Sequence, residues 1–148
     1  MPIPLRTPSD HVVDLVDESF VRARPTVLRA VLEDPRLDAL VWPGHEVSVT
    51  RDRGHKGRHY AVAGRITGVA EVWLEPFDDG TIVHHYVRGT TRALTARSAR
   101  AAVAAHRRRF KIVLNAVKDA LEADTLSSWP NAPAPASSSP PIPGPSST

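Results

Sequence analysis

The sequence contains no cysteine, one methionine and few aromatic residues among its 148 positions. Without cysteine the chain can form no disulfide bond, no thiol nucleophile and no cysteine-ligated zinc site, and this composition fits a reducing compartment. The first ten residues, MPIPLRTPSD, contain no apolar h-region, and no window approaches the 18 or more apolar residues of a membrane span. We therefore expect a cytoplasmic protein without a transmembrane segment.

Several motifs of enzymes and nucleotide-binding proteins are also missing. The sequence has no G-x-S-x-G elbow, no Walker loop and no dinucleotide-binding glycine pattern, which argues against triad, NTP and Rossmann sites. His55 and His59 have the i, i+4 spacing of helical metal ligands, but in a strand their backbones lie about 13 Å apart. We therefore expect neither a metal ion nor another cofactor.

Positive charge is concentrated in one part of the chain. Residues 91–124 contain eight lysines and arginines and three acidic residues, whereas residues 1–90 contain 11 basic and 13 acidic residues. Arg107, Arg108 and Arg109 could contact an anionic partner. Few aromatic residues lie among these cations, so base stacking has little support and we do not expect nucleic acid as a partner. The alternative for the basic residues is a solvated helix face.

The basic segment also carries the clearest periodic pattern of the sequence. An apolar arc about 100° wide predicts one long amphipathic helix over residues 95–124. At 1.5 Å per residue this helix is roughly 42 Å long and needs a broad apolar partner. The arc consists of Val103, Phe110, Val113, Leu114, Val117 and Leu121, and His106 is the one polar residue inside it.

The chain before this helix is predicted to be mainly β-structure. We expect a flexible arm over residues 1–10, a strand over 11–21, and two short helices that begin near Pro25 and Arg36. Trp42 then precedes a break at Pro43 and Gly44 and is expected to close one end of the core. Four further strands are predicted at 46–52, 57–63, 67–76 and 81–89, with a bend or turn near 64–68. Residues 125–148, which contain seven prolines, seven serines and no charge, are predicted to form a disordered tail.

The hairpin between the last two strands allows two registers. A three-residue loop, Asp78 to Gly80, places Trp73 opposite His85, whereas a two-residue loop, Asp78 and Asp79, places Trp73 opposite His84. In the second register one face carries Glu71, Trp73, His84, Tyr86 and Arg88. This face is either a wall of a ligand cavity or the outer face of the sheet. We favour the outer face, because the opposite face would otherwise expose five apolar residues: Ala70, Val72, Leu74, Val83 and Val87.

Four segments of the chain resemble the START-like, or SRPBCC, superfamily. They are FVRARPTVLRAVLEDP at 20–35, the Trp-Pro-Gly break at 42–44, AEVWLEPFDDGTIVHHYVR at 70–88, and the terminal helix through Leu121. Within the superfamily the chain is most similar to the bacterial group described as polyketide cyclase/dehydrase and lipid transport. The resemblance covers roughly residues 11–124, and it rests on the order and spacing of the segments rather than on a catalytic signature.

The resemblance implies a helix-grip α+β fold, in which a curved antiparallel sheet wraps around the C-terminal helix and leaves a cavity for a hydrophobic ligand. Members of the superfamily with the complete sheet have seven strands, whereas this sequence predicts five or six. The cavity is therefore expected to be small or absent. The residues expected to line it are Trp42, Tyr60, Val62, Val72, Leu74, His84, Tyr86, Val103, His106, Phe110, Val113 and Leu114.

His106 is the titratable residue that the helical pattern turns toward the sheet. It would serve as a general base or polar anchor in the cavity, or it would be a core histidine bonded to a backbone carbonyl or a carboxylate. His84 and His85 are adjacent on a strand and point to opposite faces, so at most one of them enters the cavity.

Three functions follow from these patterns. The first is binding, transport or sequestration of a small hydrophobic molecule such as a lipid or polyketide. The second is a cyclase or dehydratase reaction, with His106 or one of the strand histidines, His84 or His85, as the base and Tyr86 or Arg88 stabilising an enolate. The third is an interaction module that uses the basic helix face.

Overall fold

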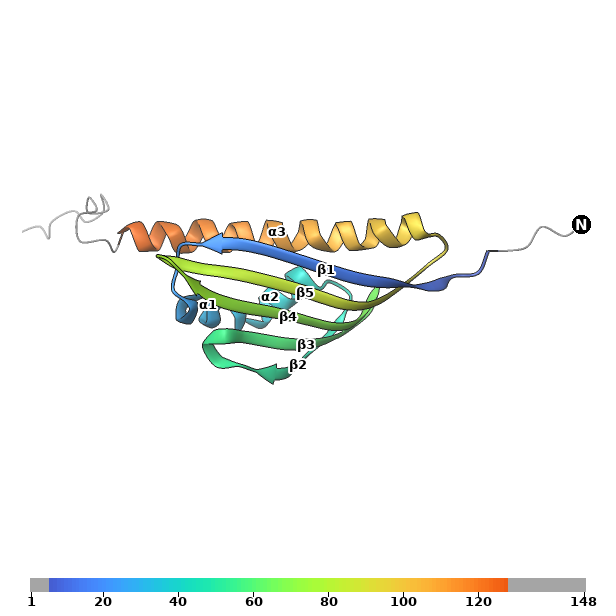
Figure 1. The fold of residues 1–148 in the computed structure, drawn as a ribbon, viewed down its shortest axis with the longest axis horizontal. Helices are drawn as coiled ribbons and strands as arrows, with labels where there is room; N and C mark the ends of the chain where they lie inside the picture. The colour runs from blue at the N-terminus through green and yellow to red at the C-terminus, as the bar shows by residue number, and fades with distance from the viewer. Residues whose placement is uncertain (1–5, 128–148) are drawn as a thin grey trace, which may run out of the picture.

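We analysed a computed structural model of the chain, which describes residues 6–127. The chain forms an α+β fold in which five strands are followed by one long helix (Figure 1). The elements in chain order are β1 (Ser9–Val21), α1 (Pro25–Leu32), α2 (Pro35–Val41), β2 (Glu46–Asp52), η1 (Gly54–Lys56), β3 (Gly57–Ala63), β4 (Ile66–Phe77), β5 (Gly80–Ala93) and α3 (Ala96–Ser127).

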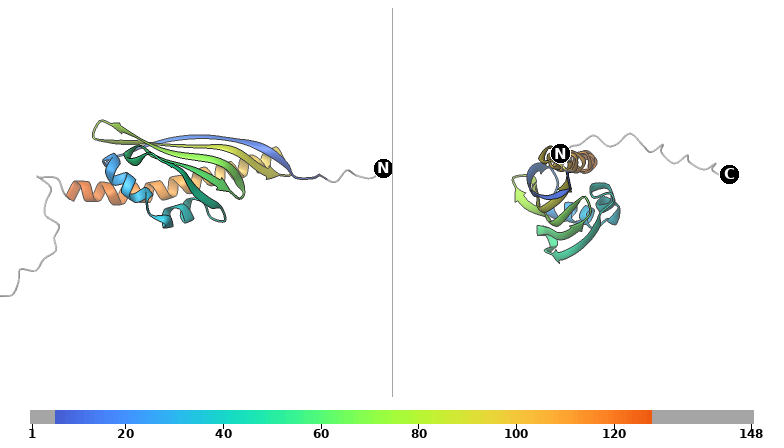
Figure 2. Two further views of the ribbon diagram at one scale, coloured as in Figure 1. Left: turned by 90° about the horizontal axis from the view of Figure 1, so that it is seen from below. Right: turned by 90° about the vertical axis from the view of Figure 1, so that its right-hand side faces the viewer.

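The five strands form a single antiparallel sheet in the order β1-β5-β4-β3-β2. The first strand therefore lies at one edge of the sheet and pairs with the last one, while β2, β3, β4 and β5 are sequential neighbours. Figure 2 shows that the sheet is curved, and that α1, α2 and α3 all lie on its concave side. We call this the inner face and the opposite side the outer face. The space between the inner face and these helices is therefore enclosed by both.

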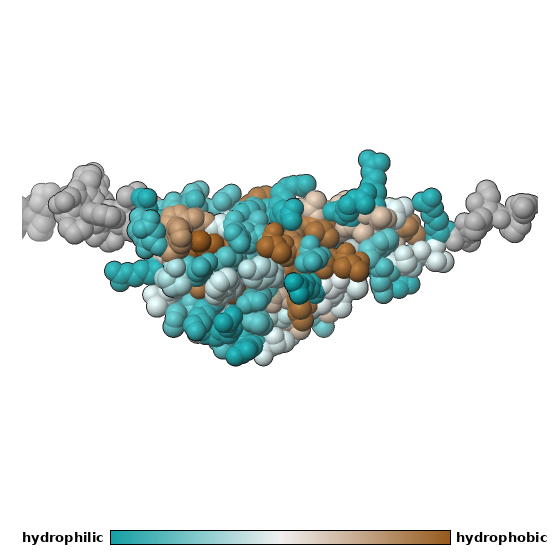
Figure 3. All heavy atoms as spheres, viewed as in Figure 1, coloured by the Kyte–Doolittle hydropathy of each residue, from teal (hydrophilic) through white to brown (hydrophobic). Residues whose placement is uncertain are grey.

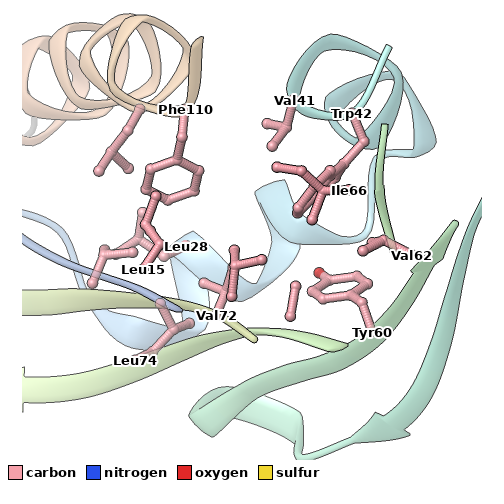
Figure 4. Close-up of a cluster of buried hydrophobic side chains, with 14 of the residues drawn as sticks. Leu15, Leu28, Val41, Trp42, Tyr60, Val62, Ile66, Val72, Leu74 and Phe110 are labelled. Carbon is pink, nitrogen blue, oxygen red and sulfur yellow. The ribbon is translucent and has the colours of Figure 1, made fainter. Parts of the chain in front are cut away.

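The hydrophobic core occupies that space. Leu15 on β1 and Leu74 on β4 are each 1% exposed, and Phe110 of α3 and Leu28 of α1 pack over them (Figure 4). At the other end of the core, Trp42 follows α2 and lies among the labelled side chains of β3 and β4. The sheet thus supplies the broad apolar partner that the helical stripe requires. Along the described part of α3, Ala99, Ala102, His106, Phe110 and Leu114 are buried.

The β4–β5 turn contains two residues, Asp78 and Asp79. Phe77 pairs with Gly80, so Trp73 lies opposite His84 and Glu71 opposite Tyr86. Asp78 has a φ of 53°, in the left-handed region that tight hairpin turns use. The second of the two predicted registers is therefore the one present, and the polar and aromatic residues Glu71, Trp73, His84, Tyr86 and Arg88 lie on the outer face.

The observed elements agree with the predicted fold, with small shifts at their ends. β1 begins two residues earlier than predicted and takes in the last two residues of the expected arm. A turn at Gly64 and Arg65 separates β3 from β4, so the sheet has five strands. α3 ends at Ser127, three residues beyond its predicted end. The rest of the predicted tail, and residues 1–5 of the arm, lie outside the described residues.

None of the helices within residues 6–127 is long and apolar enough to span a membrane.

Candidate functional site between the sheet and the helices

Two small cavities adjoin each other between the inner face of the sheet and the helices. The first has a volume of about 40 Å³ and is lined only by apolar side chains from α1, α2, β4, β5 and α3. The second, of about 30 Å³, lies toward Trp42 and Tyr60. Both cavities are lined by Leu32, Leu37, Val41, Val72 and Phe110, so one layer of side chains separates them.

The second cavity has polar groups in its wall. Asp38, Tyr60 and His85 line it together with apolar side chains and Trp42. Burial, and after it the charge of Asp38, raises the pKa of Tyr60 to about 12, so its hydroxyl keeps its proton at neutral pH. Burial likewise raises the pKa of Asp38, and the nearby Arg58 guanidinium opposes this effect. A ligand in this cavity would meet an apolar surface with a phenol and a carboxyl group at its edge.

Two histidines are bonded to each other beside this cavity. His85, on β5, is 1% exposed and His106, on α3, is 2% exposed, and their Nε2 atoms lie 2.9 Å apart. The Nδ1 atom of His85 is 3.0 Å from the carbonyl oxygen of Glu71. Because a carbonyl can only accept, His85 Nδ1 donates a hydrogen, and its Nε2 then accepts one from His106 Nε2. The backbone carbonyl of Glu71 therefore determines which nitrogen atom is the donor in each of these two hydrogen bonds.

This order leaves one nitrogen without a partner. With Nε2 of His106 protonated, its Nδ1 is an acceptor, and this atom is buried without a hydrogen-bond donor among the described residues. Burial lowers the pKa of His85 to about 4. Burial, and then electrostatic interactions with His85, Arg109 and His45, lowers the pKa of His106 to about 3. Both rings are consequently neutral at pH 7.

Aromatic contacts hold the two imidazole rings in place. Trp42 stacks on His106 with ring centroids 4.0 Å apart, and Phe110 stacks on His85 at the same distance. His45 lies edge-on to Trp42 at 5.1 Å. Its Nδ1 is 3.0 Å from the carbonyl oxygen of Pro43, and its Nε2 accepts a hydrogen from the backbone N–H of Ile66. The Trp-Pro-Gly break thus positions both an indole and an imidazole at this end of the core.

The structure brings many of the predicted ligand-binding residues together in this region. Those that line the first cavity are Val72, Leu74, Phe110, Val113 and Leu114, and those that line the second include Trp42, Tyr60, Val72 and Phe110. His106 contacts Trp42 and His85 directly. Its predicted inward orientation is confirmed. Its partner is a second imidazole, rather than the carbonyl or carboxylate that the sequence suggested.

The remaining predicted residues lie elsewhere. His84, Tyr86 and Arg88 lie on the outer face, because β5 alternates and His85 is the histidine that contacts α3. The expectation that His84 and Tyr86 line the interior cavity is therefore corrected by the two-residue turn. Val62 is buried in the core but lines neither cavity, and Val103 lines a surface groove between β1 and α3.

His84 has its own set of partners on the outer face. Its Nε2 is 2.7 Å from Glu75, its Nδ1 is 3.3 Å from Glu18, and its ring stacks on Trp73 at 4.2 Å. These contacts join β1, β5 and β4 across the outer face. Within residues 6–127, no group of three or more histidine or acidic side chains is arranged to hold a metal ion.

Sequence reasoning did not include several residues that the structure places at this site. Leu28, Leu32, Leu37 and Val41 come from the two short helices, and their apolar spacing was the only available signal. No feature of the sequence indicated that Asp38 would line the second cavity. The proposed anionic contact of Arg107, Arg108 and Arg109 stays a prediction: Arg107 and Arg108 are exposed, and Arg109 is half-buried.

No protein-family model matches the sequence, and no curated protein matches it either. Solved structures do resemble this one. The Mll3558 protein of Rhizobium loti superposes with a TM-score of 0.57 at 14% identity, over 73% of this chain and 98% of that one. The DR_A0006 protein of Deinococcus radiodurans gives a TM-score of 0.54 at 15% identity, over 76% and 99% of the two chains.

A third similar structure is the Aha1 dimer of Colwellia psychrerythraea, with a TM-score of 0.53 at 17% identity, over 74% of this chain and 96% of that one. At these identities the likeness concerns the fold. It agrees with the arrangement described above, a curved antiparallel sheet around a long C-terminal helix with two short helices after the first strand. The chain therefore has the START-like, or SRPBCC, helix-grip fold.

Proposed function

We propose that this protein binds a small hydrophobic molecule between the inner face of its sheet and its three helices. The observation that carries the proposal is the pair of adjoining cavities, the larger of which has only apolar walls. Apolar walls with a few placed polar groups are typical of small-molecule sites. Here the polar groups are Asp38, Tyr60 and His85, and His106 is bonded to His85.

The volumes restrict the size of a ligand. A cavity needs roughly 10 to 15 Å³ to hold one water molecule. Cavities of about 40 and 30 Å³ therefore each hold only a few atoms. Benzene fills an interior cavity of about 150 Å³. A ligand of that size or larger must therefore displace part of the wall. The movable part is the α1–α2 pair, because these helices have only eight and seven residues and carry Leu28, Leu32, Leu37 and Val41.

The test uses benzene as a probe and enlarges the cavity by one substitution. Leu32→Ala removes a side chain that borders both cavities, so it should join them and bind benzene at least tenfold more tightly than the wild type. Val87→Ala is the matched control, since Val87 is fully buried but lines neither cavity. Binding is measured by the amide and methyl shifts of the cavity residues in NMR spectra. Equal affinity of the two variants, or no saturable shift in the Leu32→Ala variant, would contradict the proposal.

A general-base reaction is the second candidate function, and the unpartnered Nδ1 of His106 favours it. This nitrogen is a buried acceptor without a donor among the described residues, so it is free to take up a proton. Two observations make it the weaker candidate. A pKa of about 3 makes His106 a poor base, and Tyr86 and Arg88 lie on the other side of the sheet. A test is turnover of a candidate polyketide by a His106→Ala variant, where undiminished turnover would exclude this role.

A further inference from the structure

We propose a second ligand site on the outer face of the sheet, in a groove between η1 and β4, which binds a planar aromatic molecule that carries an anionic group. The groove has a volume of about 610 Å³. Its lining includes Arg53, His55, Lys56, Trp73, Glu75 and Tyr86. Sites for small molecules have volumes of roughly 300 to 1,000 Å³. This groove is therefore already large enough for a ring, whereas the interior cavities are not.

The first argument concerns the indole ring of Trp73. One face of this ring stacks on His84, with centroids 4.2 Å apart and an angle of 18° between the planes. On the opposite side, the residue paired with Trp73 is Gly57 of β3, which has no side chain. Gly57 has a φ of 110°, and a Cβ atom there would lie 1.9 Å from the carbonyl oxygen of Val72. The fold thus requires glycine beside Trp73, and the second face of the indole stays available for stacking.

The second argument concerns charge. Glu71 is paired with Arg53 at 3.2 Å and with His59 at 3.2 Å, and Glu75 is bonded to His84 at 2.7 Å. The carboxylates at the groove therefore have basic partners. By contrast, the exposed side chains of His55 and Lys56 make no hydrogen bond or ion pair with any residue between 6 and 127.

The third argument concerns the position of these cations. η1 is a single turn between β2 and β3, and its residues His55 and Lys56 line the same groove as Trp73. Figure 3 views the outer face, where apolar residues gather in a patch right of the centre and hydrophilic residues cover the region of the β2–β3 hairpin. A ring stacked on Trp73 would have its substituent near His55 and Lys56, whose side chains have no acidic partner among residues 6–127. An anionic group can pair with the Lys56 ammonium group there, because the carboxylates of the same lining already have basic partners.

The ring and the charge could belong to an aromatic carboxylic acid or to a nucleotide. Both present a planar ring and an anion, and the experiment separates them. The full chain is titrated with 2-naphthoate and, separately, with adenosine monophosphate, and the indole N–H of Trp73 and the backbone N–H of Lys56 are followed in NMR spectra. The neutral 2-naphthalenemethanol and the non-planar cyclohexanecarboxylate are the matched probes, which each lack one of the two required properties.

We expect at least one of the two planar anions to produce saturable shifts at Trp73 and Lys56. It should bind about tenfold more tightly than either matched probe. Trp73→Leu should abolish binding, and Lys56→Gln should weaken it about fivefold and reduce its salt dependence. Lys118→Gln, which removes a lysine of α3, should have no effect. Both Lys56 and Lys118 are surface residues, so these two variants keep the fold intact for comparison.

Three results would overturn this site. One is the absence of saturable shifts with both anions. Another is equal binding of the naphthoate and the neutral alcohol, which would show that charge has no part in recognition. The last is a response confined to the indole of Trp42, which would assign the probe to the interior. None of these results bears on the interior site, because its probe is benzene and its variants lie on the inner face.

Discussion

The Nε2 atoms of His85 and His106 are joined by a single hydrogen in the interior of the protein, 2.9 Å apart. The carbonyl of Glu71 determines which ring donates, and the far nitrogen of His106 is left without a donor. A proton on Nε2 of His85 would remove the acceptor of this bond, and a proton on Nδ1 of His106 would place an unpaired charge in the core. The stability of the fold should therefore depend on these two residues in ways that can be measured.

Acid should destabilise the protein through this pair. Both histidines have folded pKa values, about 4 and 3, below the ordinary value of 6.5. The unfolded chain therefore binds more protons below pH 6.5, and the free energy of unfolding should fall as the pH decreases from about 6.5 to about 4. The slope is at most about 1.4 kcal/mol per pH unit for each histidine. Urea unfolding of the wild type and of His106→Leu at several pH values checks this. Parallel curves for the two proteins would contradict it.

The two histidines should differ in how much their loss costs. His85→Leu leaves the carbonyl of Glu71 and the Nε2–H of His106 unpaired, and should lower the free energy of unfolding by about 2 to 4 kcal/mol. His106→Leu leaves only the Nε2 of His85 unpaired and removes the unpartnered Nδ1, so about 1 to 2 kcal/mol is expected. Urea unfolding at pH 7.5 measures both. Equal costs would show that the order of donors is not as described.

Gly57 and Gly54 provide a matched pair for testing the β2–β3 hairpin. Both have positive φ, but a Cβ atom on Gly57 would meet the backbone of Val72, whereas none of the atoms around Gly54 lies within 4 Å of such a Cβ. Gly54→Ala should therefore cost about 1 kcal/mol for the backbone conformation alone. Gly57→Ala should cost about 3 kcal/mol or more, since strand pairing must also shift. Thermal and urea unfolding compare the two, and similar losses would contradict the close approach of β3 and β4.

Lys111 should couple the long helix to the first strand. Its Nζ lies 2.9 Å from the carboxylate of Asp17 and 3.3 Å from the carbonyl of Glu18, and it also bonds to Ser19. The Asp17 side chain is only 11% exposed, so Lys111→Met should destabilise the fold by about 1 to 3 kcal/mol. Adding Asp17→Asn to that variant should recover part of the loss. Additive effects of the two substitutions, measured by urea unfolding, would show that the pair is not coupled.

Much of the fold could be predicted because it depends on local patterns. The spacing of Val103, Phe110 and Leu114 indicated one long amphipathic helix and turned His106 inward without any knowledge of its partner. The partner could not be predicted, because it depends on whether the hairpin turn has two residues or three. Both were compatible with the sequence Asp-Asp-Gly.

The site was harder to predict than the fold. Asp38 and Tyr60 meet across elements that are distant in the chain, and no periodicity reports such a contact. The volume of the interior depends on how the side chains of α1 and α2 fill the space under the sheet. The outer groove depends on η1, which was not expected, and on the pairing of Gly57 with Trp73.

The two-residue turn at Asp78 and Asp79 determines which of the two neighbouring histidines of β5 faces the interior. Insertion of one residue in this turn would shift the register of β5 by one position and exchange its two faces. His84, with its carboxylate partners, would then be carried under α3, and His85 would be turned out to solvent. The separation between the histidine pair inside the protein and the carboxylate-bonded His84 outside it thus depends on the length of one hairpin loop.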